Sequence, residues 1–161
     1  MASTEQNSTH SYTFEELLDK QGGFVYTNMG YSMLPLLRQK RDIIEIRKKE
    51  PGRCKRFDVV LYKRGHKYVL HRILKVLPDG YLIAGDHCRV LERDINDERI
   101  IGVMTRVNRN GKDITPDNKW YRLYVNLWCR PYHIRMLYLH IEMFFRRCYG
   151  FVKRRIVGKR T

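Results

Sequence analysis

One serine in this chain has surroundings that suggest a nucleophile. Ser32 lies in the segment NMGYSMLPLL (residues 28–37), where apolar side chains surround a single hydroxyl group, and the chain has no serine after it. A serine hydroxyl is a weak nucleophile until a neighbouring base accepts its proton. A neutral histidine, or a lysine removed from water, serves as that base near pH 7. A catalytic role for Ser32 therefore requires a base nearby. Without one, Ser32 is equally well explained as an ordinary turn residue.

His71 is the strongest candidate for the base. It lies in YVLHRILKV (residues 68–76), where strand alternation places it on one face with Val69 and Ile73. A semi-apolar setting keeps an imidazole neutral, because burial disfavours the charged form. His66 and His87 fall in turn-like stretches, in which solvent-exposed histidines are common. We therefore expect His71 to be the base that accepts the hydroxyl proton of Ser32.

The elements that must position these two residues form a small antiparallel β-domain over residues 24–115. Short runs rich in Val, Ile and Tyr predict strands at residues 24–27, 42–49, 57–63, 67–76, 80–86 and 99–107. PDG at 78–80 and NG at 110–111 are typical of hairpin turns. No helical pattern separates the runs, which favours antiparallel pairing. The predicted fold class is therefore mainly β.

Two other segments flank the β-domain. Residues 1–23 begin with a polar stretch and continue into a predicted short helix, where Thr13 and Glu16 form a capping box and Gly22 ends the helix. Residues 116–161 predict a basic, aromatic amphipathic helical extension that Pro131 breaks or kinks. We expect its apolar face to comprise Trp120, Leu123, Tyr124, Leu127 and Trp128, followed by Ile134, Leu137, Tyr138, Ile141, Phe144 and Phe145.

Composition limits the classes of partner. The chain has 32 Lys and Arg against 17 Asp and Glu, a formal net charge of +15 that attracts nucleic acid, anionic lipid or acidic peptides.

No signal peptide is visible, and no run reaches the roughly 18 apolar residues of a membrane span, so we expect the protein to be cytoplasmic. The four cysteines form no CxxC pair, which favours reduced thiols. His87 and Cys88 lack the spacing of a metal site, and we expect no metal or cofactor.

Four segments, in order, resemble the signal peptidase I and LexA-type self-cleaving serine peptidases. GYSMLPLL resembles the nucleophile box, and FDVVLYK resembles the strand that follows it, with Phe57 where the family has glycine. YVLHRILKV is similar to the strand that bears the base, and GYLIAGDHC with IIGVM is similar to the closing block. The base is lysine in most bacterial members. His71-Arg72-Ile73 instead matches the His-Arg-(Val/Ile) signature of the endoplasmic-reticulum and sporulation-type branch. The likeness spans about residues 30–104.

The resemblance implies peptide-bond hydrolysis by a Ser-His dyad. Ser32 would attack the carbonyl, and His71 would take the proton and return it to the leaving amine. Backbone N–H groups, including that of Ser32, would hold the oxyanion. Gly30 occupies the position of a side-chain oxyanion donor in many bacterial members, so here only the backbone remains.

Other site residues follow from the same likeness. Tyr31 and Met33 flank the nucleophile and would belong to the substrate and oxyanion region. Met33 and Pro35 would position the turn and line the groove, or serve only in packing. The family's shallow pockets take small side chains before the scissile bond.

The resemblance leaves the residue that orients His71 open. Asp86 occupies the family's Gly-Asp position and would either orient His71 or act as a turn aspartate bonded to its own backbone. In the histidine-type branch the orienting acid lies slightly downstream. Glu92 and Asp94 are in that neighbourhood, but neither aligns with it. Arg72 would form an ion pair or remain solvated.

We therefore expect a serine endopeptidase of the signal-peptidase-like type that cleaves a leader or signal-like precursor. Signal peptidases carry an N-terminal membrane anchor, which is not visible here. The C-terminal amphipathic helix would replace it on an anionic membrane at the inner face of the cell membrane, or bind a membrane-protein partner, or pack on the β-domain. One alternative is a LexA-like self-cleaving or nucleic-acid-associated regulator, although the segment before Gly30 is too short for a DNA-binding module. The other is a catalytically silent membrane-surface scaffold.

Overall fold

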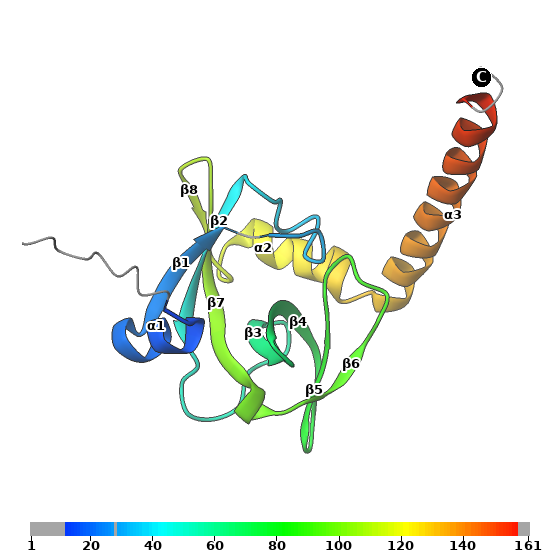
Figure 1. Ribbon diagram of the computed structural model, residues 1–161. Helices are drawn as coiled ribbons and strands as arrows, with labels where there is room; N and C mark the ends of the chain where they lie inside the picture. The colour runs from blue at the N-terminus through cyan, green and yellow to red at the C-terminus, as the bar shows by residue number, and fades with distance from the viewer. Residues whose placement is uncertain (1–11, 28, 158–161) are drawn as a thin grey trace, which may run out of the picture.

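An antiparallel sheet of eight strands forms the body of the protein in the computed structural model, which describes residues 12–27 and 29–157 and the side chains as far as Tyr149 (Figure 1). The strands run in the order β1-β2-β7-β3-β4-β5-β6, and β8 pairs with β7 outside this path. The mainly β, antiparallel fold class is therefore confirmed. The strand bounds are β1 Gly23–Thr27, β2 Asp42–Lys48, β3 Val59–Arg64, β4 Lys67–Leu77, β5 Gly80–Ala84, β6 Glu92–Ile95, β7 Ile100–Arg109 and β8 Lys112–Ile114.

All six predicted strands are present, with ends that shift by one or two residues. The PDG sequence joins β4 to β5 and the NG sequence joins β7 to β8, as the turn signals indicate. Two strands were not predicted, β6 and β8. With four and three residues, they are too short for an alternating pattern to stand out from their flanking loops.

The predicted N-terminal helix is present as α1, Phe14–Gln21. Thr13 and Glu16 form the reciprocal capping box, and Gly22 ends the helix with a φ of 70°, in the left-handed region that favours glycine. Leu18 is the buried residue of α1 and packs into the core. The polar residues 1–11 that precede this helix lie outside the described residues.

The C-terminal extension consists of α2 (Lys119–Tyr124), a π-helical segment η2 (Val125–Cys129) and α3 (Tyr132–Val157). The helix is interrupted at Pro131, as predicted. Figure 1 shows α2 and η2 against the β-domain, whereas α3 projects away from it. No helix among the described residues is long and apolar enough to cross a membrane. Residues 158–161, at the end of the basic extension, lie outside the described part.

The expected apolar face of this extension is partly wrong. Tyr121, Val125 and Cys129 are the residues buried against the β-domain, whereas Trp120 and Leu127 remain 77% and 69% exposed. The segment carries apolar side chains on more than one face, so helical periodicity alone did not identify the buried one. In α3 the expected residues do share an apolar character, but they stay exposed.

Two layers of core residues lie on opposite faces of β3, and this strand supports the candidate site. Val59 and Leu61 belong to one cluster, while Val60 and Tyr62 belong to the other. A strand buried on both faces is held firmly in register. Its neighbour β4 pairs with it antiparallel, so that Val60 lies opposite His71. A short 3-10 helix, η1 (Asp97–Arg99), leads into β7.

Candidate active site

Ser32 lies in the loop between β1 and β2. Gly30 enters this loop with a φ of 126°, a backbone conformation that residues with a side chain rarely adopt. Within the loop, the N–H of Leu37 donates to the carbonyl of Met33 at 2.9 Å. The Ser32 carbonyl accepts a hydrogen bond from the N–H of His87 at 2.8 Å, which ties the loop to the segment that follows β5.

Asp42 fixes the other end of the loop. Its side chain is fully buried and accepts hydrogen bonds from the backbone N–H of Arg38 and the side chains of Arg41 and Arg109. Burial alone would raise the pKa of Asp42, but these hydrogen bonds lower it to about 2. Arg109 also donates to the carbonyl of Leu36, so one ion-pair cluster holds the C-terminal half of the loop against β7.

His71 is buried in β4, with only 6% of its surface exposed. Burial lowers the pKa of His71 below its usual 6.5, and the negative charge of Glu92 opposes this effect without cancelling it. The imidazole is therefore neutral at pH 7, which is the form that accepts a proton.

The partners of Nδ1 determine which nitrogen of His71 is the base. Nδ1 lies 3.1 Å from the hydroxyl of Tyr62 and 3.3 Å from Oε1 of Glu92. Because the Tyr62 hydroxyl donates its proton to Glu92 at 2.7 Å, its oxygen can only accept from Nδ1, and a carboxylate likewise only accepts. The hydrogen-bond network thus assigns the imidazole proton to Nδ1 and leaves Nε2 unprotonated, as a proton acceptor that the Cys88 thiol contacts at 4.0 Å.

Gly85 marks the point where Ser32 and His71 come together. A Cβ atom built on Gly85 would lie 2.5 Å from the carbonyl oxygen of Ser32 and 3.0 Å from Nε2 of His71. Both residues also line one cavity of about 590 Å³, together with Glu92 and Cys88. The fold therefore brings the two residues predicted as nucleophile and base to the same cleft, from a loop and a strand 39 positions apart.

Cys88, considered from the sequence only as a metal ligand, also lies at this site. Its Sγ lies 4.0 Å from Nε2 of His71 and 4.0 Å from the carbonyl oxygen of Ser32. Burial raises the pKa of the Cys88 thiol, which keeps it protonated at neutral pH and unlike the thiolates of reactive cysteines. One cysteine without a CxxC partner gives no sequence signal of this position.

The prediction that Asp86 orients His71 is corrected by the structure. The Asp86 carboxylate is fully buried and accepts two hydrogen bonds from Arg72, at 2.8 and 2.7 Å, and a third from Tyr124 at 2.8 Å. The planar guanidinium of Arg72 binds both oxygens of the Asp86 carboxylate. Asp86 therefore forms an ion pair with Arg72 and does not orient His71. Glu92, of the two downstream acids, contacts Nδ1 of His71, whereas the side chain of Asp94 points to solvent.

The Asp86–Arg72 pair joins the sheet to the C-terminal extension. Arg72 also donates to the carbonyl of Phe57 and to the hydroxyl of Tyr121 in α2, each at 2.9 Å. The indole N–H of Trp128 donates to the backbone carbonyl of Asp86 at 3.0 Å. Phe57, which stands where the resembling family has glycine, has a φ of 76°, in the left-handed region that favours glycine.

The residues beside Ser32 point in different directions. Met33 is 1% exposed and belongs to the core cluster, so its role in this structure is packing. Tyr31 is 68% exposed and, with Pro35, lines a second cavity on the other side of the loop. Gly30 supplies backbone only, as expected.

The arrangement contains the parts that acyl transfer needs, namely a hydroxyl, a neutral imidazole whose Nε2 carries no proton and an acid on Nδ1. Among the described residues, no three His, Cys, Asp or Glu side chains are grouped as metal ligands. Comparison of the chain with protein-family models, with curated proteins and with solved structures gives no match. Any functional assignment therefore depends on the site itself.

Proposed function

We propose that this protein is a serine endopeptidase of the signal-peptidase-like type, with Ser32 as nucleophile and His71 as base. The observation that carries the proposal is the hydrogen-bonding of His71. Tyr62 and Glu92 occupy Nδ1, and Nε2 faces the Ser32 loop across Gly85. A neutral imidazole held in this tautomer is the arrangement that activates a serine hydroxyl.

The chemistry proceeds in two halves. Ser32 Oγ forms a bond to the peptide carbonyl carbon, while Nε2 of His71 takes the hydroxyl proton and Glu92 stabilises the imidazolium that results. Backbone N–H groups, with that of Ser32 among them, hold the oxyanion. His71 then gives its proton to the leaving amine as the C–N bond breaks. A water molecule, deprotonated by His71, attacks the acyl-enzyme and releases the carboxylic acid product and free Ser32.

The cavity that holds Ser32 and His71 suits an apolar peptide segment. Beyond the reacting residues it is lined mainly by apolar and aromatic side chains from α1, β1 and the neighbouring strands, among them Phe14, Phe24, Tyr26, Leu61 and Leu70. The substrate that fits this lining and the family resemblance is a leader or signal-like precursor, cleaved after small residues.

We also propose that α3 places the enzyme on an anionic membrane surface at the cytoplasmic face. Its exposed apolar side chains recur at helical spacing, and they are Ile134, Leu137, Tyr138, Ile141, Phe144, Phe145 and Tyr149. Arg146 and Arg147 are exposed on the same helix, and the chain carries a net charge of +15, which complements anionic lipid.

Vesicle binding tests the membrane proposal. We expect the protein to co-sediment with phosphatidylcholine vesicles that contain phosphatidylglycerol, and the double variant Ile141→Glu/Phe145→Glu to remain in the supernatant. The matched variant Ile141→Leu/Phe145→Leu keeps the apolar surface and should still sediment. Equal sedimentation of the Glu and Leu variants would overturn the proposal. A salt-sensitive gel shift with duplex DNA, without vesicle binding, would instead favour the nucleic-acid-associated alternative.

Peptide cleavage tests the enzymatic proposal. The wild type should cleave a peptide that contains an Ala-x-Ala site, and Ser32→Ala and His71→Ala should each lower kcat/KM by at least about 1,000-fold, since removal of either member of a dyad abolishes its function. Circular dichroism shows whether each variant is folded. Cleavage that persists in folded Ser32→Ala would exclude this serine as the nucleophile, and a wild type without any activity would favour the silent scaffold.

A further inference from the structure

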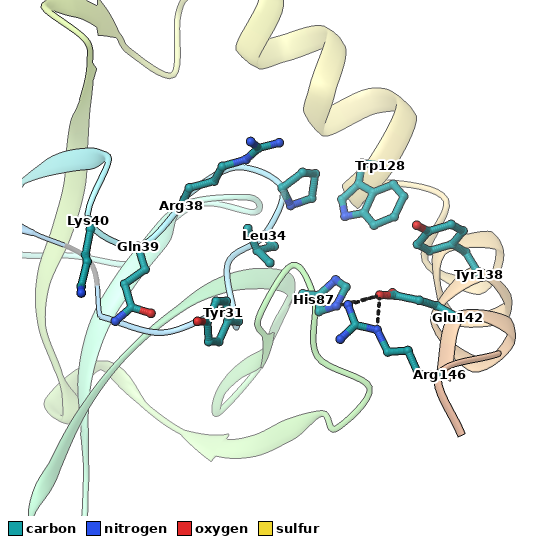
Figure 2. A pocket seen from close by; sticks show the side chains of 11 residues that line it. Tyr31, Leu34, Arg38, Gln39, Lys40, His87, Trp128, Tyr138, Glu142 and Arg146 are labelled. Carbon is teal, nitrogen blue, oxygen red and sulfur yellow. Dashed lines mark hydrogen bonds and ion pairs between the residues drawn. The ribbon is translucent and has the colours of Figure 1, made fainter. Parts of the chain in front are cut away.

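A second cavity of about 760 Å³ lies between the Ser32 loop and α3. Figure 2 shows its side chains around one opening, with Gln39 and Lys40 at one end and Tyr138, Glu142 and Arg146 of α3 at the other. The mechanism proposed above makes no use of this cavity.

Residues adjacent in the chain line the two cavities. They belong to two dipeptides, Tyr31-Ser32 and His87-Cys88, which the hydrogen bond from the His87 N–H to the Ser32 carbonyl joins at 2.8 Å. Ser32 and Cys88 line the first cavity, whereas Tyr31 and His87 line the second. Because an extended peptide advances about 3.3 Å per residue and Tyr31 adjoins Ser32, a peptide chain bound at Ser32 extends towards the second cavity within a few residues.

The charges around the second cavity are unbalanced. Glu142 is its acid and is already paired with Arg146 at 2.7 Å and with His87 at 3.5 Å. Arg38 and Lys40 are both exposed on the loop, and neither side chain has an acidic partner among the described residues. Aromatic side chains cover the opposite side, where Trp128 and Tyr138 meet edge to face with ring centroids 5.3 Å apart. The cavity therefore combines an aromatic wall with two uncompensated cations.

We propose that this second cavity binds the part of the peptide substrate on one side of the scissile bond, and that it selects acidic residues there through Arg38 and Lys40. The proposal rests on the proposed peptidase function, because the ligand is the continuation of a chain held at Ser32. It assigns a bipartite substrate, with an apolar segment in the first cavity and an acidic segment in the second.

The test compares peptides that share one Ala-x-Ala cleavage site. Two of them carry a pair of glutamates. In one, the glutamates occupy the second and third positions after the cleaved bond, and in the other they lie at the same distance before the Ala-x-Ala site. In their counterparts, these positions hold glutamine or lysine. For one of the two placements, we expect kcat/KM for the Glu peptide to exceed that for the Gln peptide about fivefold, with the Lys peptide slowest. This preference should shrink as salt is raised, because the charges are exposed.

Charge reversal identifies the residues. In Arg38→Glu/Lys40→Glu the order of the three peptides should invert, so that the Lys peptide becomes the best substrate. Lys112→Glu/Lys119→Glu makes the same change in net charge at two exposed positions that line neither cavity, and it should keep the wild-type order. If the reversed variant does not fold, Arg38→Gln/Lys40→Gln should abolish the preference without inverting it.

The outcomes separate this inference from the function on which it rests. Cleavage of all peptides at equal rates by the wild type would overturn the acidic preference and leave the peptidase intact. A preference that survives in Arg38→Glu/Lys40→Glu would also overturn it. Failure to cleave any peptide, the Gln peptide included, would count against the peptidase function itself and with it against this inference.

Discussion

Nδ1 of His71 lies 3.3 Å from Oε1 of Glu92, and both atoms contact the hydroxyl of Tyr62. This relationship defines the site more sharply than the serine does, because it fixes the tautomer of the imidazole. Glu92 begins the edge strand β6, which β5 separates from the β4 strand of His71, and its carboxylate also accepts from Arg64 at 3.2 Å. The carboxylate of Glu92 thus contacts both Arg64 and Nδ1 of His71, and it faces the imidazolium that forms during the reaction.

Glu92→Gln should lower kcat about 100-fold, because the imidazolium formed in the reaction loses its counter-charge. The same change should lower the pKa of His71 further, since the charge of Glu92 raises it. The acid limb of the kcat/KM profile, which we expect below pH 6.5 in the wild type, should therefore move to lower pH. Asp94→Asn, two residues away and exposed, is the control and should leave the profile in place. An unshifted acid limb in Glu92→Gln would reduce Glu92 to a structural residue.

Gly85→Ala should lower activity by about 100-fold or more, because the added methyl group would displace the Ser32 carbonyl or Nε2 of His71. The close contact with backbone should also cost about 1–3 kcal/mol of unfolding free energy, measured by urea denaturation. Gly65→Ala is the matched control. Its φ of 58° makes alanine strained there too, but the added Cβ would meet nothing within 4 Å, so stability falls while activity persists. Full activity in Gly85→Ala would contradict the geometry of the site.

Asp86→Asn should lower the free energy of unfolding by about 3–5 kcal/mol, because it leaves the buried guanidinium of Arg72 without its counter-charge. The buried Arg135 lies 3.7 Å from Asp86, so the charge imbalance extends to α3. Urea denaturation followed by circular dichroism measures the effect, and Asp94→Asn should change stability by less than about 0.5 kcal/mol. Unchanged stability in Asp86→Asn, combined with a shifted pH profile of activity, would restore Asp86 as the residue that orients His71.

The stability of the fold should fall in acid through Asp42. Its pKa is about 2 in the folded protein and about 3.9 in an unfolded chain, so the folded state binds the proton less readily. The contribution of Asp42, about 2–3 kcal/mol, is present above the unfolded pKa of about 4 and is lost as the pH falls through the folded pKa of about 2. In Asp42→Asn we expect lower stability at neutral pH and a smaller loss between pH 4 and 2. An identical acid transition in both proteins would place the sensitive carboxylate elsewhere.

The sequence predicted those parts of the site that depend on local pattern. Ser32 and His71 were found because each lies within a recognisable segment, and the six longer strands and α1 followed from alternation and capping. Glu92 and Tyr62 were not assigned to His71, because their positions depend on strand pairing and on the course of residues 85–91. The same limit explains why the role of Asp86 was predicted wrongly, because its carboxylate pairs with Arg72, 14 positions away in the sequence. The second cavity depends on where the part of α3 that bears Tyr138, Glu142 and Arg146 lies relative to the Ser32 loop, which no local pattern describes.

The most direct test of the central claim is covalent labelling with a serine-directed fluorophosphonate, because it requires no knowledge of the natural substrate. After proteolysis, mass spectrometry locates the adduct. We predict that the wild type is labelled at Ser32, that Cys88→Ser is labelled equally, and that folded His71→Ala is not labelled. Absence of an adduct on Ser32 in the wild type, or labelling of Ser32 that continues without His71, would contradict the account.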